Sequence, residues 1–160
     1  MIGIIIAAGS GKRISNNVKD LPKSLLTVNG KPIIDYQIQA LKQVGIQDVV
    51  VITGQHGNKF ELNNVQYVKD HHYEKHDILG SLIVAKDFIK GESVITYSDI
   101  LFDAVILEQI IQQECDIGIA IDMNWTKAYE GRTLHLSLIH ISEPTRPRLI
   151  SYAVFGVKKK

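Results

Sequence analysis

The sequence predicts an α/β fold in which helices cover both faces of a mostly parallel sheet. Short segments rich in Ile and Val are apolar on consecutive residues, which is typical of strands buried on both faces. Segments with apolar residues at helical spacing lie between them, and this alternation of strand and helix indicates parallel pairing. The 160 residues are enough for one domain with a substantial core.

Four segments are predicted strands, and a fifth is a weaker candidate. The four predicted strands are residues 3–7, 48–53, 93–97 and 117–121. Residues 64–68 are less apolar, so we expect them to lie nearer an edge of the sheet.

Three amphipathic helices are predicted between these strands. The first begins at Pro32, which suits a first helical position, and ends at Gly45. Its apolar stripe consists of Ile34, Ile38, Leu41 and Val44. The other two stripes are Ile78, Leu82, Ala85 and Ile89, which ends at Gly91, and Ala104, Leu107, Ile110 and Ile111.

The composition limits the classes of protein to consider. No apolar run approaches the roughly 18 residues of a membrane span. Basic residues follow the first apolar segment instead of preceding it, which argues against a secretory signal. The single cysteine, Cys115, cannot form an internal disulfide, and this favours a reducing compartment. The formal net charge of +1 gives no indication of nucleic-acid binding. We therefore expect a cytoplasmic protein with no nucleic-acid or membrane partner.

The last 25 residues do not continue the pattern. Residues 136–160 have neither helical nor useful strand periodicity. Residues 136–146, LSLIHISEPTR, match the translated adapter of a common transposase-based sequencing library, and residues 150–155, ISYAVF, match its next segment. We therefore expect the N-terminal part of a domain over 1–135 and a non-native, adapter-derived tail over 136–160. Five of the 18 basic residues and one of the 17 acidic residues lie in this tail, so the remainder has a net charge of −3.

The glycine-rich loop in IIIAAGSGKR, residues 4–13, departs from two familiar phosphate-binding motifs. A dinucleotide-binding turn, G-x-G-x-x-G, would need glycine where Ile14 stands. A P-loop would need glycine at Ile6 and a metal-binding hydroxyl at Arg13. Both of these interpretations fail.

The loop nevertheless suits phosphate. Small residues at Ala7, Ala8 and Gly9 allow a flat ligand close to the backbone. The segment Gly9-Ser10-Gly11 can turn several N–H groups toward phosphate oxygens, and Lys12 and Arg13 add two cations. The alternative is a solvated turn between a strand and a helix.

Two further motifs extend this pattern, LPKSLL at residues 21–26 and GKPII at residues 30–34. Together with the first loop they resemble the nucleotidyltransferase superfamily that couples NTPs to phosphorylated metabolites. The resemblance implies a three-layer, Rossmann-like sandwich, here C-terminally truncated. The stretches 76–89, 93–102 and 122–135 are most similar to cytidylyltransferases for phosphocholine or small phosphonates. Those enzymes usually carry an Asn pair where this chain has Asp77 and Ile78.

The resemblance also implies roles for the charged residues. Arg13, with Lys12 and the loop amides, would hold the β- and γ-phosphates, and Lys23 would reach the α-phosphate and the acceptor oxyanion. Asp99 follows a predicted strand and would bind Mg²⁺, whose preferred ligands are carboxylate and phosphate oxygens. Asp99 could instead simply cap the next segment. A second metal-binding carboxylate would lie in the part that the tail replaces.

Weaker assignments concern the base and the acceptor. Gly80 and Ser81 would pass near the nucleotide base, opposite Ala7 and Gly9, or would simply start a helix with Ser81 as its cap. Trp125 and Tyr129 could hold a quaternary ammonium over their rings, or merely pack one helical face. Arg132 would contact the acceptor or brace a loop.

A group of histidines also raises the question of a zinc site. His72 and His76 are one helical turn apart, and His71 is nearby, but no cysteine or third spaced ligand accompanies them. We do not expect a metal there.

The partners implied are CTP or another NTP, Mg²⁺ and a phosphorylated small molecule, with a homo-oligomer possible. The alternatives are a sugar-1-phosphate nucleotidyltransferase that uses UTP, dTTP or GTP, and a non-catalytic regulatory domain of the same fold. We expect the 160 residues alone to bind nucleotide weakly at best and to turn over nothing.

Overall fold

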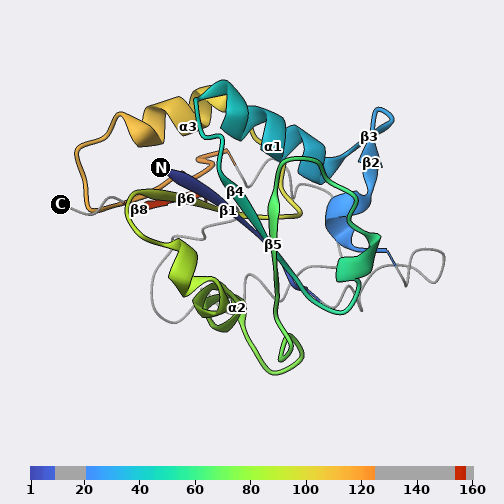
Figure 1. The fold of residues 1–160 in the computed structure, drawn as a ribbon. Helices are drawn as coiled ribbons and strands as arrows, with labels where there is room; N and C mark the ends of the chain where they lie inside the picture. Colours follow the sequence, from blue (N-terminus) through green and yellow to red (C-terminus); the bar gives the residue numbers. More distant parts are fainter. Residues whose placement is uncertain (10–20, 125–153, 158–160) are drawn as a thin grey trace, which may run out of the picture.

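A six-stranded sheet in the order β5-β4-β1-β6-β8-β7 organises the computed structural model, which describes residues 1–9, 21–124 and 154–157 (Figure 1). Four neighbouring strands are parallel: β5 (Gln66–Lys69), β4 (Val49–Thr53), β1 (Ile2–Ala7) and β6 (Ser93–Tyr97). The other two are β8 (Val154–Val157), antiparallel to β6, and β7 (Ile117–Ile119), antiparallel to β8. The predicted α/β class with a mostly parallel sheet is confirmed.

The predicted strands are present, with small differences at their ends. The weaker candidate forms β5, which lies at an edge of the sheet as expected. The strand expected over 117–121 ends at Ile119, and its isoleucines are exposed, so the prediction that this strand is covered on both faces is wrong. Residues 154–157 form a strand inside the tail, for which no regular structure was expected. This strand inserts between β6 and β7 by backbone pairing.

In the described part of the chain, three α-helices connect the strands: α1 (Ile33–Gln43), α2 (Ile78–Val84) and α3 (Ala104–Ile111). Pro32 is not the first residue of α1, because it lies in extended backbone and pairs with Thr27 in a small hairpin. The second helix ends at Val84 instead of continuing to Gly91, and a 3-10 turn, η4 (Lys86–Phe88), follows it. Side chains of Asp77 and Asp103 accept backbone N–H bonds at the starts of α2 and α3, as N-caps do.

The hairpin before α1 joins β2 (Thr27–Val28) to β3 (Lys31–Pro32). Its two turn residues, Asn29 and Gly30, both have positive φ, at 51° and 78°. An Asn-Gly pair tolerates this left-handed backbone at little cost, so it favours a tight two-residue turn.

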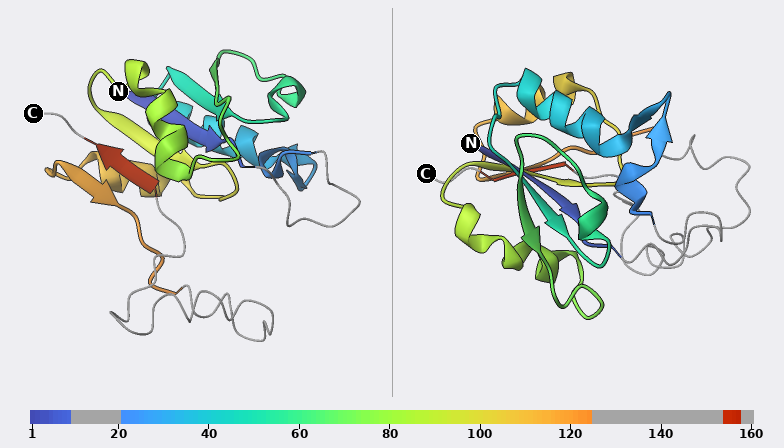
Figure 2. Two further views of the ribbon diagram at one scale, coloured as in Figure 1. Left: turned by 90° about the horizontal axis from the view of Figure 1, so that it is seen from below. Right: turned by 45° about the vertical axis from the view of Figure 1, so that its right-hand side comes forward.

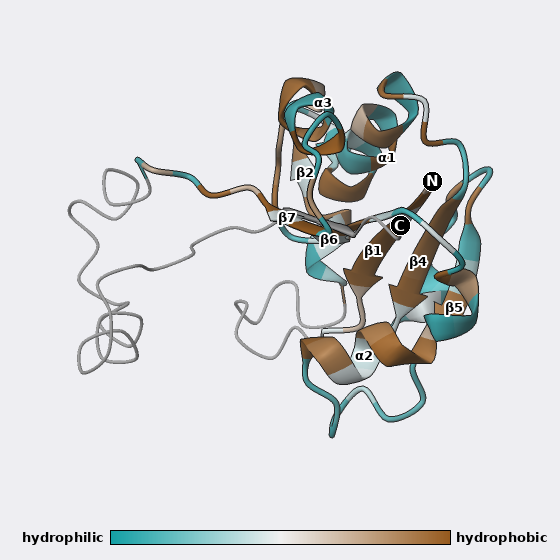
Figure 3. Cartoon of the chain, turned by 90° about the vertical axis from the view of Figure 1, so that its left-hand side faces the viewer, coloured by the Kyte–Doolittle hydropathy of each residue, from teal (hydrophilic) through white to brown (hydrophobic). Residues whose placement is uncertain are grey.

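The helices form two layers around the sheet. Helices α1 and α3 cover one face and α2 covers the other, as Figure 2 shows from two sides. Successive residues of β1 point to opposite faces, so Ile5 joins the core under α1 while Ile4 and Ile6 join the core over α2. In Figure 3, β1 and β4 are largely brown between the two helical layers.

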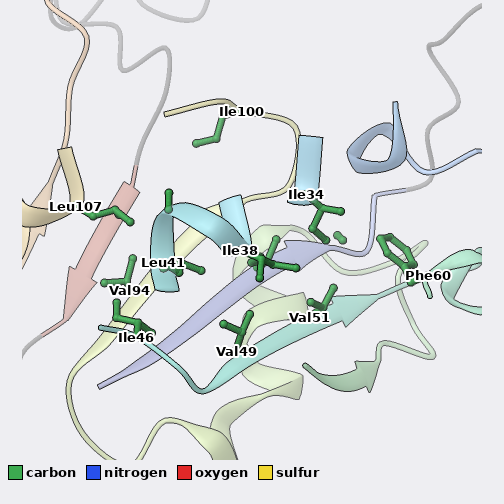
Figure 4. Packing of buried hydrophobic residues seen from close by; sticks show 13 residues of the cluster. Ile34, Ile38, Leu41, Ile46, Val49, Val51, Phe60, Val94, Ile100 and Leu107 are labelled. Carbon is green, nitrogen blue, oxygen red and sulfur yellow. The ribbon is translucent and has the colours of Figure 1, made fainter. Parts of the chain in front are cut away.

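The larger core lies between α1 and the sheet (Figure 4). Ile34 and Leu41 of α1 are fully buried there, together with Val51 of β4. Gly3 lies opposite Leu41, where an added Cβ would come within 2.9 Å of Leu41 Cδ1. The absence of a side chain at Gly3 therefore lets α1 approach β1 closely. Within the described residues, no helix is long and apolar enough to cross a membrane.

The chain order of the strands fixes where a ligand would bind. From β1 the chain moves outward through α1 to β4 and β5, and then returns through α2 to β6 on the other side of β1. The direction of winding therefore changes between β1 and β6. Open α/β sheets bind their ligands at the carboxyl ends of strands at such a switch point.

Candidate functional site

The carboxyl ends of β1 and β6 are joined beyond the strands themselves. The backbone N–H of Ser98 donates to the carbonyl of Ile6 at 3.2 Å, which places the segment after β6 beside the segment after β1. Ala8 is buried at this edge, and Gly54, after β4, packs directly on it. A Cβ at Gly54 would lie only 2.4 Å from the Ala8 carbonyl oxygen. The start of the glycine-rich loop is therefore closely packed against the ends of the neighbouring strands.

Gly9 is exposed, and a Cβ added to it would meet no heavy atom within 4 Å. The backbone is thus open on that side at the point where the loop leaves the sheet. The other predicted loop residues, Ser10, Gly11, Lys12 and Arg13, lie outside the described residues, as do the predicted acceptor residues Trp125, Tyr129 and Arg132.

Lys23 and Asp99, which are far apart in the sequence, meet at this switch point. Lys23 begins a 3-10 turn, η2 (Lys23–Leu25), directly after Pro22. Its Nζ lies 3.5 Å from Asp99 Oδ2, and the two side chains keep 36% and 46% of their accessible surface. The pair is a cation and a carboxylate open to solvent at the carboxyl edge of the sheet, where both can reach a ligand.

The backbone around Asp99 is held by Gln37, which was not among the residues predicted from sequence. Gln37 lies on α1 and is fully buried. Its Nε2 donates to the carbonyls of Tyr97 at 2.7 Å and Ile100 at 2.6 Å, on either side of Asp99. The available signal was a polar residue inside the apolar stripe of α1, three residues after Ile34 and next to Ile38.

Asp99 also affects its neighbour Tyr97. Burial, together with the negative charge of Asp99, raises the pKa of the Tyr97 hydroxyl above its ordinary value. Tyr97 therefore stays neutral at the edge of the site.

Ser81 belongs to a different cluster, centred on Asp70 at the end of β5. Its hydroxyl donates to Asp70 Oδ2 at 2.8 Å, while the backbone N–H of His72 donates to Oδ1 at 2.8 Å. His76 Nδ1 lies 3.0 Å from Oδ1 and 3.1 Å from Oδ2. Burial alone would raise the pKa of Asp70, but the bonds from Ser81, the His72 backbone and His76 together hold it below its ordinary value.

The expectation of a helix start at Gly80 and Ser81 with Ser81 as its cap is correct for the helix start and wrong for the cap. Residues Gly80 and Ser81 lie in the first turn of α2, and the cap is Asp77, whose Oδ1 accepts from the Gly80 N–H at 2.8 Å. Ser81 is therefore not the cap of the helix. Among the described residues no group of three His, Cys, Asp or Glu side chains could hold a metal ion, and His76 is bound to Asp70.

A cavity of about 870 Å³ opens beside Asp99. Its lining is mostly apolar and comes from the segment after β6, from α3, and from β7 with the segment after it, including Phe102, Ile110 and Ala120. Ile33, at the start of α1, also lines it. The space is large enough for a small molecule next to the carboxylate.

Residues 3–140 match the family model described as the MobA-like NTP transferase domain. The chain is 30% identical over 145 residues to the CTP:phosphoglutamine cytidylyltransferase of Campylobacter jejuni, covering 82% of this chain and 56% of that protein. It is 27% identical over 123 residues to the UTP–glucose-1-phosphate uridylyltransferase of Haloferax volcanii, covering 72% of this chain and 50% of that protein.

The fold is similar to the solved structure of the CTP:phosphocholine cytidylyltransferase of Streptococcus pneumoniae. The TM-score is 0.58 and the sequences are 32% identical, with 65% of this chain and 49% of that chain covered. The chain spans about half the length of the curated relatives it matches.

Proposed function

Because the chain belongs to the MobA-like NTP transferase family, we propose that it is part of an enzyme that transfers a nucleotidyl group to a phosphorylated small molecule. The observation that carries this proposal is the pairing of Lys23 with Asp99 at 3.5 Å, at the switch point of the sheet. A cation and a carboxylate placed together suit the two needs of the reaction, which are to neutralise phosphate oxygens and to hold a divalent cation.

In this reaction an oxygen of the acceptor phosphate attacks the α-phosphorus of the NTP, and the bond from that phosphorus to the pyrophosphate oxygen breaks. Two anionic groups must approach each other, so the protein contributes mainly by positioning and by neutralising charge. Lys23 is proposed to contact the α-phosphate and the attacking oxygen with its ammonium group. Arg13 and Lys12 are proposed to stabilise the departing pyrophosphate.

The residues present fit a Mg²⁺ ion. Asp99 offers a hard, half-exposed carboxylate beside an open cavity, and Mg²⁺ usually takes one or two carboxylates together with phosphate oxygens and water. When bound, Mg²⁺ would neutralise phosphate charge at the reacting centre. A single carboxylate holds the ion weakly by itself, so we expect metal and nucleotide to bind together.

CTP is the proposed nucleotide, and the proposed acceptor is a small phosphorylated or phosphonate compound such as phosphocholine or 2-aminoethylphosphonate. The cytidylyltransferases among the relatives support this choice. The cavity beside Asp99 is the proposed place of the acceptor. Trp125, Tyr129 and Arg132 are proposed to contribute to its recognition.

A sugar-1-phosphate nucleotidyltransferase is the second candidate, supported by the uridylyltransferase among the relatives. A non-catalytic domain of the same fold is less well supported, since Lys23 and Asp99 are both present and paired.

Pyrophosphate release tests the proposal. A version extended to the full length of the relatives would be assayed with each of the four NTPs against phosphocholine, 2-aminoethylphosphonate, phosphoglutamine and glucose 1-phosphate. We expect CTP with one of the first three acceptors to give the fastest release. Turnover with glucose 1-phosphate alone would refute the cytidylyltransferase assignment. Absence of turnover with every pair of NTP and acceptor would refute the proposal that the extended protein is a nucleotidyltransferase.

Two controls sharpen this assay. Lys23→Met in the extended version should lower the rate about 10²–10³-fold, the typical cost of losing one group that stabilises developing charge. The 160-residue chain itself should give no pyrophosphate, and rapid CTP-dependent release by it would contradict our expectation.

A further inference from the structure

Gln37 is a polar side chain placed where the core of the protein would accept an apolar one. It lies on the buried face of α1 between Ile34 and Ile38 and is itself fully buried. Both of its described hydrogen bonds go to a single short segment, to the carbonyls of Tyr97 and Ile100. These two carbonyls bracket Ser98 and Asp99, so one amide group holds both ends of the turn that carries the carboxylate.

The other half of the Lys23–Asp99 pair is attached to the same helix. The N–H of Ile33, the first residue of α1, donates to the carbonyl of Leu26 at 3.0 Å, directly after the η2 turn that carries Lys23. Helix α1 therefore braces the lysine through its first residue and the aspartate through Gln37. The two charged residues are 76 positions apart in the sequence, and one helix is hydrogen-bonded to the segments that carry both of them.

The amide nitrogen of Gln37 is hydrogen-bonded, but within the described part of the chain its amide oxygen is not. Its two donors are used, whereas its Oε1 is buried and has no hydrogen-bond partner among the described residues. A buried amide oxygen without a partner destabilises the fold, so core packing alone would not favour a glutamine at this position. The amide is therefore better explained by what its N–H groups hold than by core stability.

We propose that Gln37 is a positioning residue that fixes the Asp99 carboxylate for the metal ion and the reacting phosphates. The proposal rests on the proposed function and extends it to a residue outside the site. Without the amide, the carbonyls of Tyr97 and Ile100 would turn to find other partners, and the peptide groups around Asp99 would turn with them. The carboxylate would then spend less time facing Lys23 and the cavity.

The test compares Gln37→Met with Ile38→Val in the 160-residue chain. Methionine keeps the length and burial of the side chain but removes both donors. Ile38→Val is the matched control, because Ile38 is the next residue on α1, is also buried and makes no polar contact with the Asp99 segment. Mn²⁺, a paramagnetic substitute for Mg²⁺, is titrated in the presence of a fixed excess of CTP while the amide signals of residues 98–101 are followed by NMR.

In the wild-type chain we expect saturable broadening of the signals of residues 98–101, which Asp99→Asn abolishes. Gln37→Met should need about tenfold more Mn²⁺ for the same broadening, as is usual when a partner of a metal ligand is removed. Its amide hydrogens at residues 99–101 should also exchange faster. Ile38→Val should match the wild type in both measurements.

The proposal is overturned if Gln37→Met and Ile38→Val show the same Mn²⁺ dependence, or if the wild type shows no broadening centred on residues 98–101. Faster exchange in Gln37→Met without a change in Mn²⁺ dependence would also overturn it, since Gln37 would then support only the loop. The proposed function is tested separately by pyrophosphate release in the extended version. If that assay fails while the Mn²⁺ result holds, the enzyme assignment falls and the positioning role of Gln37 stands.

Discussion

Two aspartates follow parallel strands of the same sheet, and their surroundings differ sharply. Asp70 comes directly after β5, is fully buried and binds Ser81, His76 and the backbone of His72. Asp99 follows β6, keeps 46% of its side-chain surface, and has Lys23 at 3.5 Å. Both residues are polar and follow a parallel strand, and this position alone would make either one a candidate site residue.

The difference shows which of the two is available to a ligand. The oxygens of Asp70 are already used by neighbours, so this carboxylate serves the fold by holding the start of α2 to the end of β5. Asp99 faces a cavity and solvent, and its neighbour is the partly exposed ammonium group of Lys23. The strand order agrees, because β5 is an edge strand whereas β6 lies at the switch point.

The largest expected effect is that of Asp99→Asn on activity. In the extended version the rate of pyrophosphate release should fall about 10²–10³-fold, because the proposed metal ligand is lost. The free energy of unfolding should change by no more than about 0.5 kcal/mol, since exposed ion pairs contribute little. Urea denaturation of the 160-residue chain measures the second quantity. A large loss of stability would show that Asp99 is a structural residue like Asp70.

The corresponding change at the buried aspartate, Asp70→Asn, should lower the free energy of unfolding. An amide has only one acceptor oxygen, so it cannot keep all the hydrogen bonds that this carboxylate accepts, and a bond to a buried charge is worth about 1.5–3 kcal/mol. We expect the free energy of unfolding to fall by about 2–3 kcal/mol in urea denaturation. Ser81→Ala, which removes one of these bonds, should cost less. If Asp70→Asn were neutral in stability but abolished turnover in the extended version, the comparison between the two aspartates would be reversed.

Lowering the pH should reduce the contribution of the Asp70 cluster to the free energy of unfolding. The pKa of Asp70 lies below its ordinary value near 3.8 in the folded chain, so the unfolded chain binds its proton first as the pH falls. The stabilisation is therefore complete above that value and is lost as the pH falls through the folded pKa. The groups facing Asp70 are Ser81, His76 and the His72 backbone. The difference in unfolding free energy between wild type and Asp70→Asn should narrow between pH 5 and the most acidic pH at which the chain folds. A constant difference would contradict the assignment.

The fold could be predicted from the sequence wherever local pattern and burial agree. The central strands are apolar on consecutive residues and lie where expected, and α3 matches its apolar stripe. The errors occur where pairing or position in the folded sheet overrides the local sequence pattern. Pro32 suits a helix start, yet it pairs with Thr27, and the apolar run at 117–121 lies at a sheet edge with exposed isoleucines.

The site was predictable only in part. Lys23 and Asp99 were singled out by motif, and the structure brings them together. Gln37 and Asp70 were not, because their importance depends on residues distant in the sequence. A buried glutamine is recognisable only once the turn after β6 lies under α1, and Asp70 only once α2 returns to β5.

The smallest expected effect is the coupling between Lys23 and Asp99 in a double-mutant cycle. Lys23→Met, Asp99→Asn and the double variant should give a coupling in unfolding free energy of about 0.2–0.5 kcal/mol at low salt. At 1 M salt the Debye length falls to about 3 Å, so the coupling should vanish. The cycle between Ser81→Ala and Asp70→Asn should instead give a larger coupling that salt leaves almost unchanged, because that bond is buried. Should both cycles respond to salt alike, the two carboxylates would share one kind of environment. A coupling confined to low salt at Lys23 and Asp99 would mean that the pair contributes almost nothing to holding the fold, which leaves both charges available to phosphate and metal.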